Sequence, residues 1–135
     1  MSLKTIVPPC LDLWTESYIC DTSLTARQYT CVIAVAAATG KYHVTTPGGQ
    51  GVLTCGILQN APASGAMAEV RKLGTSKVVA GGKFNAGILL TVDGTNGQVE
   101  AAATGDYVIG VAGEGSAEAG QLVKVELCSV PWLVD

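Results

Sequence analysis

The feature that most constrains this chain is the alternation of short apolar runs with glycine-containing turns. The longest apolar run covers only residues 31–38, and turn sequences such as PGGQG (47–51) and DGTNG (93–97) separate the runs. Short runs rich in β-branched residues and bounded by such turns are typical of strands, whereas helices are usually longer. The pattern predicts an all-β domain, built as a small sandwich or barrel of short antiparallel strands.

The expected strands cover residues 28–35, 41–46, 51–58, 75–80, 88–92, 98–102, 106–112 and 121–128. In the last of them, Val123 and Val125 alternate with Lys124 and Glu126, so one face points inward and the other outward. Residues 66–73 are a helix candidate because their intrinsic helix propensity is good. A helix of this length gains little stability by itself, so a strand is the preferred interpretation.

A weak internal repeat runs through the β region. The series TGKYHV…GVLTCGIL…APASGAMAEV resembles the later series NGQVEA…DYVIGVA…GSAEAGQLVKV. Gly40 then corresponds to Gly97, and Gly56 corresponds to Gly110, although the spacing drifts along the chain. The repeat fits two similar β units that share one core. The alternative is that all-β chains of this composition repeat such patterns without duplication.

Residues 1–23 differ from the rest and are predicted to form an extended N-terminal arm, followed by a β domain over residues 24–135. The alternative is that the apolar side chains of the arm pack on the domain's own core. Five side chains near the two ends are candidate contacts with another subunit: Leu11, Trp14, Tyr18, Trp132 and Leu133. Large aromatic side chains typically contribute about 2 kcal/mol or more at the centre of an interface. For Trp132, the alternative is that the indole caps the open end of the barrel.

Charged residues make up 14% of the chain, and the formal net charge is −3. Few charges need desolvation on such a surface, which favours protein contacts. The 8 Lys and Arg residues are spread along the chain, so nucleic-acid binding is not expected. No apolar run is long enough to span a membrane, and the first ten residues lack the apolar core of a signal peptide. Synthesis in a cytoplasm is therefore expected.

The residue types that carry catalysis are sparse. His43 is the single histidine, and its strand pattern points it to solvent. No G-x-S-x-G elbow is present, and GEGSAEAG (113–120) is interpreted as a turn, not as a dinucleotide site. The 5 cysteines lack C-x-x-C spacing, so neither a disulfide framework nor a zinc site is expected. Cys31, Cys55 and Cys128 lie in apolar runs and are expected to be small buried hydrophobes. No enzyme activity, metal or cofactor is predicted.

Three segments follow one another in a recognisable order. They are GILQNAPASGAMAEVRKLG (56–74), SKVVAGGKFNAGILLTVDGTNGQVEAAATGDYVIGVA (76–112) and AEAGQLVKVEL (117–127). The ordered series resembles the capsid decoration, or cement, proteins of tailed bacteriophages, in the branch often called β-tulip. The chain departs from the family pattern where Ile88 replaces the usual aspartate after Ala86-Gly87. A second departure is at residues 113–115, where relatives carry alanines.

The resemblance implies a structural virion protein that binds the outer surface of the capsid as a homotrimer, contacts the major capsid protein and stabilises the shell. It also implies that residues 56–70 form a strand, a tight turn and a return strand, in which glycine and alanine permit close backbone approach. Other interpretations remain open. The chain could be a tail or fibre subunit, a β-rich module for glycans or small ligands, or an enzyme that depends on His43.

Overall fold

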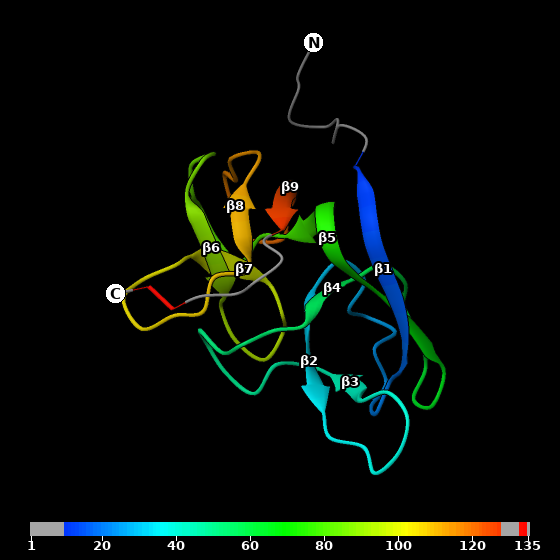
Figure 1. The fold of residues 1–135 in the computed structure, drawn as a ribbon. Coiled ribbons are helices and arrows are strands. Elements are labelled where there is room, and N and C mark those ends of the chain that lie inside the picture. Colours follow the sequence, from blue (N-terminus) through cyan, green and yellow to red (C-terminus); the bar gives the residue numbers. More distant parts are fainter. Residues whose placement is uncertain (1–9, 128–132, 135) are drawn as a thin grey trace.

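The computed structural model describes residues 10–127 and 133–134, which contain strands, turns and loops but no helix (Figure 1). The strands are β1 (Asp12–Ile19), β2 (Cys31–Val35), β3 (His43–Thr45), β4 (Gly56–Leu58), β5 (Met67–Val79), β6 (Leu89–Val92), β7 (Val99–Ala101), β8 (Gly110–Ala112) and β9 (Leu122–Leu127). Their order in the sheet is β3-β2-β4-β5-β9-β8-β6-β7, and β1 also pairs with β5. All these pairs are antiparallel, which confirms the predicted fold class.

Residues 66–73, the helix candidate of the sequence analysis, fall almost entirely within strand β5. Its first half is a strand and not a helix, because Ala68 and Val70 are buried while Glu69 and Arg71 are partly exposed. That period of two lets one face fill the core and leaves the other to solvent. Pairing of β4 with β5, in which Leu58 lies opposite Val70, also confirms the predicted strand, turn and return strand.

Strand β1 was not among the expected strands. It runs antiparallel to β5, with Ile19 opposite Met67 and Tyr18 opposite Ala68, and its register shifts between Asp12 and Thr15. Figure 1 shows β1 and β5 side by side over the length of β1. Of the two interpretations of the N-terminal segment, packing on the chain's own sheet therefore holds for residues 12–19. The small Ala68 leaves room for the Tyr18 ring, which is 5% exposed.

Two pairs of glycines support the internal repeat. A Cβ on Gly56 would lie 2.5 Å from the Arg71 carbonyl oxygen, and a Cβ on Gly110 would lie 2.1 Å from the Glu126 oxygen. Each glycine thus lets its short strand approach the next strand closely. Two later glycines, 65 and 120, also adopt matching left-handed φ angles of 83° and 87°. The third pair does not match, because a Cβ on Gly97 would lie 2.6 Å from the Cys31 carbonyl oxygen, whereas a Cβ on Gly40 would have no neighbour within 4 Å.

The repeated elements form two small barrels. The first unit contains β1 to β4 and the first half of β5, and the second contains the rest of β5 and β6 to β9. The first closes where Cys20 bridges Val44, and the second closes where Ala80 bridges Val99. Because β5 is continuous, it belongs to both barrels and holds them together.

The apolar interior follows this division. One cluster of buried side chains lies mainly in the second unit and includes Leu90, Val92 and Val123. The other lies in the first unit and includes Leu58 and Val70. The repeat was expected to fit two units with one shared core. The structure has two clusters instead, because each small barrel is filled mainly by the inward side chains of its own strands, although Cys31 and Ile57 of the first unit join the second cluster.

Candidate functional site

Within the described residues, most of the exposed large apolar side chains lie on β1, just before it or on the neighbouring β5. Leu11 and Leu13 are each 60% exposed, and Trp14 is 43% exposed. At the other end of β1, Ile19 and Met67 lie opposite each other and are also exposed. An apolar surface on a strand at the edge of a sheet is typical of protein contacts. We name this surface the β1 surface.

Sequence reasoning found part of the β1 surface. It named Leu11 and Trp14, and it missed Leu13, Ile19 and Met67. The sequence identifies Leu13 and Ile19 as exposed only if residues 12–19 are already known to be a strand. The alternation of side chains along that strand then places both on its outer face. Tyr18 was also named, but its side chain is buried among the core residues of the first unit.

Beneath Trp14, a lysine is enclosed by aromatic rings. Lys72 Nζ donates hydrogen bonds to the hydroxyls of Tyr18, at 2.8 Å, and Tyr42, at 2.5 Å. The two tyrosine rings stack with their centroids 4.6 Å apart. Lys72 Nζ also lies 5.0 Å from the centre of the Trp14 ring, which is within the range of a cation–π interaction. We name these four residues the lysine–aromatic cluster.

The cluster changes the acidity of its members. Burial raises the pKa of Tyr42 to about 12, against the opposing effect of the hydrogen bond from Lys72. For Lys72, burial lowers the pKa, but the hydrogen bonds to Tyr18 and Tyr42 outweigh burial and the pKa is raised. At neutral pH the lysine is therefore charged and the Tyr42 hydroxyl remains protonated, so Lys72 donates and Tyr42 accepts in a stable hydrogen bond.

The second unit has no such cluster at the matching place. In the first unit Tyr18 lies opposite Ala68, and in the second unit Val78 lies opposite Val123. Ala68 and Val123 hold the same place in the repeat, so Tyr18 and Val78 occupy equivalent positions. The residue equivalent to Lys72 is Leu127, which packs against the second unit's core. The lysine–aromatic cluster is thus specific to the first barrel, on the side that carries the β1 surface.

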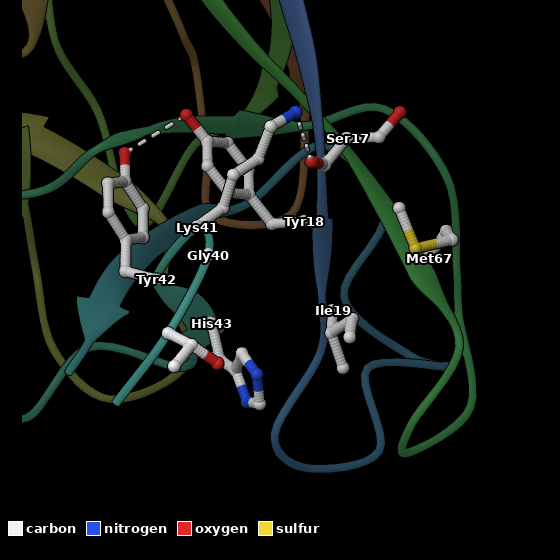
Figure 2. A pocket seen from close by; sticks show the side chains of 9 residues that line it. Ser17, Tyr18, Ile19, Gly40, Lys41, Tyr42, His43 and Met67 are labelled. Carbon is white, nitrogen blue, oxygen red and sulfur yellow. Dashed lines mark hydrogen bonds between the residues drawn. The ribbon is translucent and has the colours of Figure 1, made fainter. Parts of the chain in front are cut away.

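A groove of about 310 Å³ lies beside the cluster, between the end of β1 and the segment that leads into β3. Figure 2 shows Ile19 and Met67 on one side of it and His43 and Tyr42 on the other. Lys41 reaches across this groove. Its Nζ lies 2.7 Å from a Glu16 carboxylate oxygen and 3.2 Å from the carbonyl oxygen of Ser17.

The ion pair beside the groove is largely exposed to water. The hydrogen bond from Lys41, with a further one from Trp14, lowers the pKa of Glu16, and the same contact with Glu16 raises the pKa of Lys41. Exposed pairs of this kind contribute little to stability. Lys41 therefore covers the edge of β1 without holding it firmly.

The C-terminal candidates lie in the second unit or outside the described residues. Leu133 is 48% exposed and bridges Tyr107. The Val134 backbone N–H donates to the Asp106 carbonyl at 2.9 Å, which ties this end to the second barrel. Trp132 lies outside the described residues. The structure does not bring Leu133 onto the β1 surface, because the two belong to different barrels.

The groups with reactive side chains are spread over the fold. His43 Nδ1 lies 3.1 Å from an Asp21 carboxylate oxygen, and both side chains are partly exposed. Burial raises the pKa of the Cys31 thiol, and it raises that of Cys55 to about 11. Both thiols are therefore protonated at neutral pH and poor nucleophiles. Cys31 is buried as expected, Cys55 is half-buried, and Cys128 lies outside the described residues.

Within residues 10–127 and 133–134, no group of three or more His, Cys, Asp or Glu side chains is placed to hold a metal ion. In the same residues, no helix is long and apolar enough to cross a membrane.

Comparison with known proteins gives a likeness of fold. No protein-family model matches the chain, and no curated protein matches it. Among solved structures, the chain is similar to the crystal structure of the head fiber gp8.5 N base in bacteriophage phi29. The TM-score is 0.67 at 16% sequence identity, and the match covers 88% of this chain and 97% of that chain. At this identity the likeness shows a common fold.

Proposed function

We propose that the protein is a structural component of a phage virion, that it attaches to the outer surface of the head, and that it acts by binding without catalysis. The β1 surface carries this proposal. It presents Leu13 and Trp14 on β1 and Leu11 immediately before it, and pairing with β5 holds the strand in place. A preorganised apolar surface loses little conformational freedom on binding. The shared fold with a phage head fiber base and the order of the sequence motifs support the same setting.

In this proposal, the partner is the major capsid protein. The protein would be made in the host cytoplasm, assemble as a homotrimer and stabilise the shell from outside. Trp14 is the expected central contact, because its indole is partly exposed and is held by a hydrogen bond of 3.1 Å to Glu16 and by the charge of Lys72. A rigid aromatic side chain of this kind is typical of binding hot spots.

A second candidate is the base of a head fibre, and the name of the solved structure favours it. The two functions differ in their effect on the shell. A cement protein raises the temperature at which empty heads break open, whereas a fibre base binds without changing that temperature.

Binding to heads that lack the protein tests the proposal. We expect the wild-type chain to cosediment with the heads until sites are saturated. Trp14→Ala should weaken binding by about tenfold or more, in line with a hot spot of about 2 kcal/mol. Its far-UV spectrum should match the wild type, because an exposed cation–π contact contributes only about 0.5–1 kcal/mol to folding.

Leu53→Ala is the matched control, since Leu53 is also half exposed but lies in the loop between β3 and β4. This variant should bind heads normally. Failure of the wild-type protein to cosediment with heads would contradict the proposal. Collapse of the Trp14→Ala spectrum would show that Trp14 serves the fold and not a partner.

A further inference from the structure

The two barrels meet through a segment that bridges a gap in the second one. The gap lies between the end of β5 and Gly97, two residues before β7. Residues 29–31 of the first unit occupy it. The Tyr29 carbonyl accepts a hydrogen bond of 2.9 Å from the Val79 backbone N–H, and the Cys31 N–H donates one of 2.8 Å to the Gly97 carbonyl. We name this contact the internal junction.

The first barrel has the same gap, and it is the groove of Figure 2. Ile19 is equivalent to Val79, because Cys20 and Ala80, which follow them, make matching backbone bonds to Ala66 and Gln121. The Cys20 N–H points toward β5, so the N–H of Ile19 points the other way, into the groove.

The opposite wall of the groove offers the matching acceptor. The Val44 carbonyl accepts a hydrogen bond of 2.8 Å from the Asp21 backbone N–H. In the second barrel, the Val99 carbonyl accepts the matching bond of 2.7 Å from the Gly81 N–H. Carbonyls two residues apart along an extended chain point to the same side, so the carbonyl of Tyr42 faces the groove. The first barrel therefore has the same donor and acceptor that bind residues 29–31 in the second.

The second barrel carries the equivalent of the bridging segment. Thr30 and Ile88 correspond, because their carbonyls accept matching bonds of 2.9 Å from the N–H groups of Leu58 and Ala112. Cys31 then corresponds to Leu89. Thr30 and Cys31 are buried, whereas Ile88 and Leu89 are only half-buried. The segment 87–89 thus has the backbone form of residues 29–31 but leaves apolar side chains partly uncovered.

The first barrel therefore has a groove like the one that is filled in the internal junction, and the second barrel has a segment, residues 87–89, like the one that fills it. We propose that two copies meet head to tail, with residues 87–89 of one copy lying in the groove between Ile19 and Tyr42 of the next. Figure 1 shows the segment before β6 and the lower end of β1 on opposite sides of the molecule, so one copy cannot join its own ends. The Lys41–Glu16 ion pair beside the groove is exposed, so breaking it when residues 87–89 enter costs little free energy.

A contact of this kind is heterologous, and repeated addition of copies either closes a ring or extends a filament. The trimer proposed above would be a closed ring of three chains. The inference concerns contacts between copies of the chain, and it stands whether or not the protein binds a phage head.

Complementation between two blocked variants tests the inference. Ile19→Glu places a charge in the groove, and Ile88→Glu places one on the bridging segment. We expect the wild type to form oligomers whose mass rises with concentration in light scattering. Each variant alone should be a monomer of 13.7 kDa. An equimolar mixture should form a dimer and stop there, because one intact groove meets one intact segment.

Controls separate this outcome from misfolding. Leu53→Glu adds a charge at an exposed leucine elsewhere and should oligomerise like the wild type. Because Ile88 also contacts the core, Ala86→Arg on the same exposed segment is a second blocked variant. Each variant should keep the wild-type far-UV spectrum. A wild-type protein that remains monomeric at about 1 mM would overturn the inference. So would folded Ile19→Glu and Ile88→Glu variants that do not associate when mixed.

Discussion

At the scale of single residues, burial and hydrogen bonding in the lysine–aromatic cluster distinguish a core side chain from one that a partner can reach. Tyr18 looks like an interface residue in the sequence. Its ring instead stacks on Tyr42, and its hydroxyl accepts a bond from Lys72, so it fills the mouth of the first barrel. Trp14 covers the lysine from outside and stays partly exposed. Trp14, with its side chain partly exposed, can contact a partner through its ring without opening the barrel.

The raised pKa of Tyr42 predicts a loss of stability at high pH. The ordinary pKa is 10.0 and the value in the fold is about 12, so between these values the folded protein keeps a proton that the unfolded chain releases. The free energy of unfolding therefore falls as pH rises through this window, and the raised pKa of Lys72 acts in the same direction.

Tyr42→Phe should make that decline less steep. The variant should also lose about 1 kcal/mol at neutral pH, because a hydrogen bond to Lys72 is removed. Urea unfolding at neutral pH and at about pH 11 measures both effects. Tyr29→Phe, which removes a hydroxyl outside the cluster, is the matched control and should follow the wild-type curve. Parallel curves for Tyr42→Phe and the wild type would contradict the assignment.

At the scale of elements, β1 is the strand that sequence reasoning missed. Its residues do not alternate cleanly, because the register shifts near Trp14 and because Glu16 and Tyr18 face the mouth of the barrel. The pattern that predicts a strand was therefore absent, although the candidate contacts Leu11 and Trp14 were found. By contrast, the first half of β5 was identified as a strand in spite of its good helix propensity, since pairing on both sides overrides propensity.

Removal of β1 should unfold the first barrel. Without residues 1–19, the core side chains that Tyr18 covers would face water, and one edge of β5 would lose its partner. We expect loss of the wild-type far-UV spectrum and strong binding of a dye for exposed apolar surface. A truncated protein that keeps its spectrum and unfolding midpoint would show that residues 12–19 are a dispensable arm.

At the scale of the whole molecule, the duplication links two cores into one unit. Strand β5 runs through both barrels, and neighbouring residues of β2 point to different clusters, Cys31 to the second and Val32 to the first. The internal junction adds backbone bonds between the barrels. The two cores should therefore unfold together in one cooperative transition.

Matched core substitutions in the two barrels test this cooperativity. Leu58 lies in the first cluster and Leu90 in the second, and both are fully buried. Leu58→Ala and Leu90→Ala should each cost about 3 kcal/mol. In calorimetry, each should lower the midpoint of a single transition. Two separate transitions in either variant would show that the barrels unfold independently.

The sequence by itself determined the all-β class and the places of most strands, and it suggested the repeat marked by Gly56 and Gly110, because turns and strand alternation are local properties of the chain. It also named Leu11 and Trp14 as candidate contacts, and both side chains are exposed in the structure. The tertiary structure alone decided that the repeat forms two barrels, that Tyr18 is buried and that a groove opens beside Ile19. These depend on which strands pair across long sequence separations, and a local pattern does not encode that choice.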